Sequence, residues 1–366
     1  MSMKLFTTLN SRRAHGPCHA VASRAGGFSL IEILVSIVVL TLILLIVSQL
    51  MTSATTIVRS GSKHIDNDTQ GRAVLNRMAV DFAKMLKRSD LDYYLKGPAN
   101  YTGHGNGHAW GAKVKTNQKG SDQIAFFSQV PGYYPSESQY PLGDQSPLSL
   151  VAYRINDDST SQSYLMLERM GKGLLWNGVD NGNSQSANYP IVFLPYTIGG
   201  ITPWSAAVNN DGNTTSKDPA YETIGPQVFR FEYYYLLKSG KLTDIPWDLD
   251  AGHTSVNGLT DVEGIGVAFA VIDPASRSLV SAASLWALAS DMADFKSAPG
   301  RGVGGAKKTG DLENYWKGVL FGNTNLGLPG VVNTGQTSAA TGSLPFAPSA
   351  ASAIRIYNRY FDLKIL

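Results

Sequence analysis

The sequence predicts an α+β protein in which a long N-terminal helix precedes an antiparallel, β-rich head. Three observations support this prediction. An uninterrupted apolar run extends from Phe28 to Val47. Residues 71–86 repeat apolar side chains at three- and four-residue spacing, which indicates a helix with one buried face. Beyond residue 100, short runs of β-branched and aromatic residues alternate with Gly-, Asn- and Ser-rich stretches, which indicates strands joined by long loops.

The positive charge of the 366-residue chain is concentrated in its first 27 residues, whose only charged side chains are Lys4, Arg12, Arg13 and Arg24. The chain has 31 basic and 28 acidic residues, so removing these four leaves 27 against 28. A nearly neutral body is not typical of a nucleic-acid-binding protein, and we expect no such partner. The only cysteine, Cys18, lies in the same segment. Without this segment the chain could form neither a disulfide nor a Cys-based zinc site.

The apolar run is long enough to cross a membrane. From Phe28 to Val47 there are 20 residues, of which only Glu32 is charged. At about 1.5 Å per residue this helix spans about 30 Å, the thickness of the hydrocarbon core. A secretory signal peptide has an apolar region of only about 7–15 residues. Because the basic segment comes first, the positive-inside rule predicts a cytoplasmic N-terminus, a single pass through the inner membrane and a head in the periplasm or at the cell surface.

Glu32 requires an explanation, since a charge within hydrocarbon costs about 2.5–3.5 kcal/mol on insertion scales. The stretch GGFSLIEILVS at 26–36 resembles the class III leader of type IV pilins and type II secretion pseudopilins. The resemblance implies that a prepilin peptidase cuts after Gly27 and that Phe28 becomes the N-methylated first residue. It also implies that Glu32 pairs with the N-terminal amine of a neighbouring subunit. An uncleaved signal anchor is the alternative, but it does not account for Gly27 and Glu32 together.

The resemblance divides the chain into a leader at 1–27, a long helix at 28–96 and a globular β-rich head at 97–366. The first part of the helix, 28–47, spans the membrane. The implied fold is a pilin-like lollipop, in which the second part of the helix packs on the antiparallel sheet of a head with long loops. The implied partners are the prepilin peptidase, other pilin-like subunits and an inner-membrane assembly platform.

The second part of the helix is expected to bend at 60–62, where Ser-Gly-Ser weakens it, and to be capped again by polar residues at 66–69. Its buried stripe comprises Val74, Leu75, Met78, Phe82, Met85 and Leu86. Asp81 lies beside this stripe, and we interpret it as part of a solvated helix face.

The head is expected to contain several strands. They are predicted at 122–128, 149–156, 163–170, 191–198 and 227–237, and 264–277 is predicted as a buried strand that leads into a turn, with 353–365 closing the sheet. Residues 149–156 and 163–170 form a hairpin, and a helix extends through 285–295. In 227–237, aromatic residues occupy one face and Arg230 and Glu232 the other. Surface loops are predicted at 99–121, 177–190, 205–222 and 298–350.

Several stretches resemble the J-type minor pseudopilins of type II secretion. GRAVLNRMAVDFAKML at 71–86 is similar to their Arg- and Leu-rich helix, which ends in an Asp-hydrophobic pair. VFRFEYYY at 228–235 and GVAFAVIDP at 266–274 are similar to their paired late strands. The length, the leader and the IRIYNRYF ending also resemble the Verru_Chthon cassette protein C family, whose members are prepilin-like. The two families agree on about the first seventy residues.

We find no catalytic group in the sequence and expect no enzyme. His104 and His108 have helical spacing but lie among glycines, so we predict solvated histidines rather than a metal site. GRGVGG at 300–305 follows a proline and no strand, which argues against a nucleotide site. No cofactor is predicted. Calcium is the one ion with candidate ligands, in Asp-rich loops at 156–158, 180–183, 209–213 and 248–250.

Two functions follow. The first is a minor pseudopilin that is cleaved, N-methylated and assembled into a periplasmic pseudopilus or type IV pilus-like fibre, with its bulky head near the tip. The second is a membrane-anchored binding module or adhesin with no role in a fibre. Its ligand would stack on loop tryptophans, for which the candidates are Trp110, Trp176, Trp204 and Trp247.

Overall fold

The computed structural model describes residues 29–87, 93–94, 103–104, 123–133, 145–173, 221–243, 262–295, 307–338 and 342–363. The chain forms two compact units, Met1–Arg59 and Ser60–Leu366. The first helix, α1 (Leu30–Ala83), contributes residues to both units. The predicted leader, including Gly27 and Phe28, lies outside the described residues.

In the first unit, α1 is apolar and exposed. Every described side chain from Ser29 to Val58 is exposed in the isolated chain. The segment Leu30–Val58 is long and apolar enough to cross a membrane. This segment fits the membrane anchor that the apolar run predicts.

The predicted restart of the helix is wrong. Helical structure continues without interruption through 60–62 and 66–69, so the polar residues at 66–69 do not cap a second helix. They instead bind the rest of the head. The buried Asn67 donates to the carbonyl oxygen of Ala353 at 3.2 Å, and Asp68 accepts a hydrogen bond from the Tyr357 hydroxyl.

The helix also ends earlier than residue 96. After Ala83 the chain becomes extended and joins a sheet, because Met85 forms an antiparallel bridge with Ser128 and the Leu86 amide donates to Phe127 at 2.9 Å. The predicted stripe is confirmed at its centre, where Val74, Met78 and Phe82 are buried. Leu75 and Met85 are also buried as predicted, and only Leu86 differs, since it is half-buried.

A six-stranded sheet occupies one side of the second unit. Its strands are β3 (Gln123–Ser128), β4 (Gly132–Tyr133), β5 (Gln145–Ser146), β6 (Ser149–Ile155), β7 (Leu167–Gly173) and β8 (Tyr221–Gly225). The order is β3-β6-β7-β4-β5, with β8 pairing β7, and only β4 and β7 are parallel. The predicted β6–β7 hairpin is confirmed. Its second strand begins late because residues 159–165 form turns, in which Leu165 takes a left-handed φ of 54°.

A four-stranded antiparallel sheet follows the order β10-β9-β11-β12. Its strands are β9 (Val228–Leu237), β10 (Leu242–Thr243), β11 (Val262–Val271) and β12 (Arg355–Asp362). The predicted strand at 227–237 and the closing C-terminal strand are confirmed. A small pair, β1 (Tyr93–Tyr94) and β2 (Gly103–His104), stands apart. The strand predicted at 191–198 lies outside the described residues.

The predicted loop at 298–350 is wrong for much of its length. The helices after β11 are α3 (Pro274–Arg277), α4 (Ala282–Asp291), α5 (Asp311–Phe321), η2 (Thr324–Leu326), α6 (Val331–Thr334) and α7 (Pro348–Ala353). The helix predicted at 285–295 is α4, which the Ser281 side chain caps by accepting from the Ser284 amide at 3.0 Å. Within the stretch that was predicted as a loop, α5 forms because Leu312, Trp316 and Leu320 make a buried stripe at four-residue spacing.

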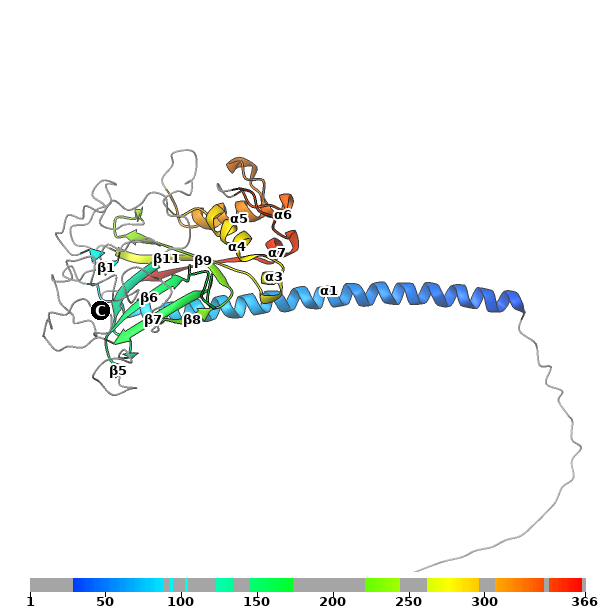
Figure 1. The fold of residues 1–366 in the computed structure, drawn as a ribbon, viewed down its shortest axis with the longest axis horizontal. Helices are drawn as coiled ribbons and strands as arrows, with labels where there is room; N and C mark the ends of the chain where they lie inside the picture. Colours follow the sequence, from blue (N-terminus) through cyan, green and yellow to red (C-terminus); the bar gives the residue numbers. More distant parts are fainter. Residues whose placement is uncertain are drawn as a thin grey trace, which may run out of the picture. The chain divides into compact units, whose positions relative to one another are not determined.

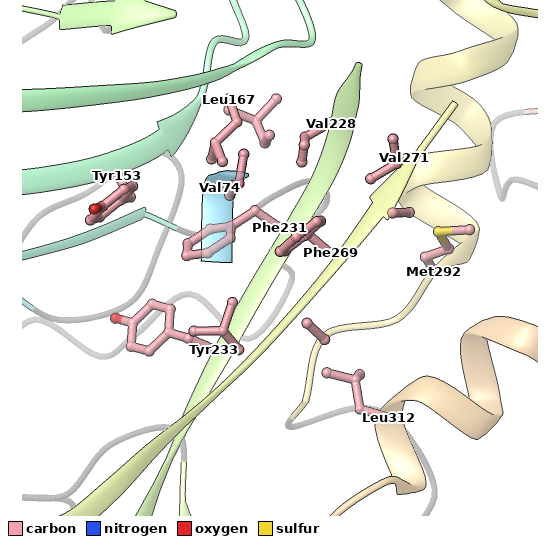
Figure 2. Packing of buried hydrophobic residues seen from close by; sticks show 14 of the residues in the cluster. Val74, Tyr153, Leu167, Val228, Phe231, Tyr233, Phe269, Val271, Met292 and Leu312 are labelled. Carbon is pink, nitrogen blue, oxygen red and sulfur yellow. The ribbon is translucent and has the colours of Figure 1, made fainter. Parts of the chain in front are cut away.

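The four-stranded sheet lies between the six-stranded sheet and the helices α4 and α5 (Figure 1). Its inner face, with Phe231 and Tyr233 on β9 and Phe269 on β11, packs towards Val74 of α1 and Tyr153 of β6 (Figure 2). Its other face is covered by residues around Met292 and by α5. The α+β class with an antiparallel β-sheet head on a long N-terminal helix is therefore confirmed.

Candidate functional site

The start of α1 carries the first candidate site, around Glu32. The Glu32 amide donates to the Ser29 hydroxyl oxygen at 3.2 Å, and the Ser29 amide donates to Oε2 of Glu32 at 3.1 Å. This reciprocal pair is a capping box, which satisfies two amides that the first turn leaves without helical partners. The capping role of Ser29 was not predicted from the sequence, although Ser-x-x-Glu before an apolar run is the signal of this motif.

The capping box leaves the Glu32 carboxylate able to accept a further bond. Only Oε2 takes part in the bonds to Ser29. Among the residues that the structure describes, no basic side chain lies within ion-pair distance of Glu32. A carboxylate in the first turn is favoured by the helix dipole by about 0.3–1 kcal/mol, which is too little to offset burial in hydrocarbon. A cation from outside the described residues would compensate this charge.

The second candidate site is the buried carboxylate of Asp81, which ties α1 to the six-stranded sheet. Arg169 of β7 forms a bidentate pair with it, with Nε at 2.7 Å from Oδ2 and Nη2 at 3.0 Å from Oδ1. The Tyr153 hydroxyl on β6 also donates to Asp81. Burial, followed by the charge of Asp81, raises the pKa of Tyr153 well above its ordinary value. The interpretation of Asp81 as a solvated residue is therefore wrong.

A second buried charge cluster lies on the opposite face of the four-stranded sheet. Arg230 on β9 is fully buried, with Nη2 at 3.2 Å from Glu232 and 2.7 Å from Asp294. Glu232 accepts from the Phe295 amide at 2.8 Å. The alternation in 227–237 placed Arg230 and Glu232 correctly on one face, but their burial depends on the chain after α4. The central residues of the two clusters, Asp81 and Arg230, are fully buried, and each cluster joins separate elements of the head.

The described residues contain no group of three or more His, Cys, Asp or Glu side chains arranged to hold a metal. His104 lies in β2 rather than in a loop, and His108 lies outside the described residues. The GRGVGG stretch at 300–305 also lies outside the described residues. Of the four Asp-rich loops, only 156–158 is described. There Asp158 accepts from the Thr160 amide and hydroxyl at 2.9 and 2.8 Å, which is the geometry of a turn.

Comparison with known proteins identifies the N-terminal segment. The family described as the prokaryotic N-terminal methylation motif matches residues 22–48. A search of curated proteins finds no match. The matched segment includes Gly27, Phe28 and Glu32. It supports a type IV pilin-like protein that a prepilin peptidase processes and that assembles with other pilin subunits, and the motif is typical of structural subunits.

Proposed function

We propose that this chain is a minor pseudopilin, cut between Gly27 and Phe28 and assembled into a periplasmic pseudopilus or type IV pilus-like fibre. The observation that carries the proposal is the coincidence of two features. The methylation motif covers 22–48, and within it Glu32 is the only charged residue of an exposed apolar helix. A carboxylate at this position does not favour an ordinary membrane anchor, because a charge within hydrocarbon raises the free energy of insertion.

In this proposal, cleavage creates the partner that Glu32 lacks. The new N-terminal amine of Phe28 is positively charged, and in a neighbouring subunit it pairs with the Glu32 carboxylate. The pair neutralises two charges in an apolar environment and fixes the axial stagger between parallel helices. The apolar side chains of Leu30–Val58 then exchange lipid contacts for contacts with other helices.

The basic leader supports a cytoplasmic N-terminus at the inner membrane, with the head on the periplasmic side or at the cell surface. The assembly platform and the prepilin peptidase would act from the membrane.

The J-type assignment is supported by the Asp81–Phe82 pair at the end of α1 and by the pairing of β9 with β11. A large head suits a subunit near the fibre tip, since bulky heads crowd a repeating lattice. The Verru_Chthon cassette protein C resemblance implies the same processing and differs in the machine that the fibre serves.

The anchored binding module remains the second candidate. Its candidate tryptophans at 110, 176, 204 and 247 lie outside the described residues, so no described surface favours it.

Two substitutions at Glu32 test the pairing. Glu32→Gln keeps an oxygen that can accept from the Ser29 amide, so the capping box survives while the charge is lost. Glu32→Ala removes both. We expect both variants to insert and to be cleaved, and both to lose incorporation into sheared fibres by about tenfold or more. Thr41→Ala is the control, because its hydroxyl bonds only its own helix, at Ile37 and Val38. Normal incorporation of Glu32→Gln would show that charge pairing is not required.

A further inference from the structure

Glu313 is a buried carboxylate for which the described structure supplies no partner. It lies in the first turn of α5 and is only 4% exposed. Among the described residues, neither Oε1 nor Oε2 accepts a hydrogen bond, and both atoms are inaccessible to solvent. No ion pair in the described part of the chain involves Glu313.

The α5 helix packs against β12, and after burial the charge of Glu313 is the next cause that raises the pKa of two tyrosines in the sheet. Gly266 on β11 is paired in register with Tyr234 of β9 on one side and Tyr360 of β12 on the other. Because Gly266 has no side chain, the Tyr234 ring lies across it, and an added Cβ would meet Tyr234 Cζ at 2.6 Å. The two rings meet edge to face at a centroid distance of 6.2 Å.

The hydroxyls of these tyrosines differ in their bonding. The backbone of Gly310, just before α5, is hydrogen-bonded to Tyr234. The Tyr360 hydroxyl is buried and has no hydrogen-bond partner in the described structure. Burial, then the charges of Glu313 and Glu263, raises the pKa of Tyr360 to about 12. Both phenols are thus neutral at physiological pH, and they offer oxygen lone pairs without adding negative charge.

Lys307, which lies a few residues before α5, is engaged with Phe295. Lys307 lies 4.5 Å above the Phe295 ring and donates to the Phe295 carbonyl oxygen. Phe295 in turn stacks on Tyr234 at 4.5 Å, so Lys307 is separated from the tyrosine pair by an aromatic ring.

A buried carboxylate is normally paired, hydrogen-bonded or bound to a metal ion. We propose that Glu313 and Tyr360 bind a hard cation between α5 and the four-stranded sheet. The donor set is all oxygen, which is the chemistry of calcium, sodium and potassium rather than of zinc. The bound ion would fasten the α5 region to β9 and β12, independently of how the N-terminal helix assembles.

The test is the thermal stability of the full chain in detergent, exchanged into chelator with choline chloride as the only salt. Calcium, sodium or potassium chloride is then added separately. We expect at least one cation to raise the Tm of the wild-type chain by about 3 °C or more at saturation. Glu313→Gln should abolish the response. Glu263→Gln is the matched control, since Glu263 lies on β11 near Tyr360 but is exposed, and it should keep the response.

Tyr360→Phe provides a second variant if Glu313→Gln does not fold, because it removes one oxygen and keeps the ring. It should require a higher cation concentration for the same shift in Tm. The proposal is overturned if no cation raises the Tm of the wild-type chain. It is also overturned if the cation that raises this Tm raises the Tm of Glu313→Gln equally. Where Glu313→Gln is unfolded, an equal rise in the Tm of Tyr360→Phe overturns it.

Discussion

Asp81 is the residue through which α1 is joined to the six-stranded sheet, and its environment makes it sensitive to truncation. It is fully buried and receives charged hydrogen bonds from Arg169 and one from Tyr153. Among the described residues, Asp81→Ala would leave the buried Arg169 with only the exposed Glu222, at 3.6 Å from Nη1, as an ionic partner. We expect a loss of about 3–5 kcal/mol in the free energy of unfolding, measured by urea denaturation of the full chain in detergent.

Arg77→Ala is the matched control for Asp81→Ala. Arg77 lies 3.8 Å from the same carboxylate, but its side chain is 45% exposed. Its removal should lower the free energy of unfolding by less than about 1 kcal/mol. Equal losses for the two variants would contradict the assignment of Arg169 as the principal partner.

The ionisation of Tyr360 should make the stability of the head depend on pH in the alkaline range. The pKa of Tyr360 is about 12 in the folded chain, chiefly through burial, whereas an unfolded tyrosine ionises near pH 10. Between these values the unfolded chain binds fewer protons, so the stabilisation present below about pH 10 is lost as the pH rises towards 12. Urea midpoints measured from pH 8 to 11, in chelator with choline chloride as the only salt so that no cation binds Tyr360, should fall less steeply for Tyr360→Phe. An unchanged slope would contradict this prediction.

At the scale of elements, two glycines should respond in opposite ways to alanine. Gly61 lies within α1 and an added Cβ would meet nothing within 4 Å, so Gly61→Ala should add about 0.5–1 kcal/mol to the free energy of unfolding by improving helix propensity.

Gly266→Ala would force the Tyr234 ring away from β11, although Phe295 stacks on that ring. It should lower the free energy of unfolding by about 1–3 kcal/mol. Urea denaturation tests both, and a neutral Gly266→Ala would contradict the tight packing of Tyr234.

The elements that sequence reasoning found are those with a local signal. β9 and β11 stand out because their apolar periodicity is continuous over the strand. α5 was missed because glycines at 310 and 322 bound it and the surrounding composition is typical of a loop, which concealed its four-residue stripe. Asp81 was misjudged because Arg169 and Tyr153 are far from it in sequence, and nothing local indicates that they meet.

The candidate site at the N-terminus shows the same division. Gly27, Phe28 and Glu32 could be selected from one chain, since the motif that contains them is contiguous. The capping box with Ser29 was equally local and was overlooked. The pairing of Glu32 remains a prediction because its expected partner, a free amine, belongs to another subunit and exists only after cleavage.

At the scale of the whole molecule, the proposed function requires a change in covalent structure, the cleavage between Gly27 and Phe28. Before cleavage, the basic leader and the apolar segment Leu30–Val58 would form a membrane-inserted precursor. After cleavage, the chain would gain a charged terminus four residues before Glu32 and would be competent to leave the membrane. The head, with its two larger sheets and its buried charge clusters, would remain unchanged by this step.

The N-terminus of the membrane-extracted protein, determined by mass spectrometry, tests this account most directly. We predict a chain that begins with methylated Phe28. An intact start at Met1, or a cut near Ala54, would contradict prepilin processing and leave the protein as an anchored or secreted domain.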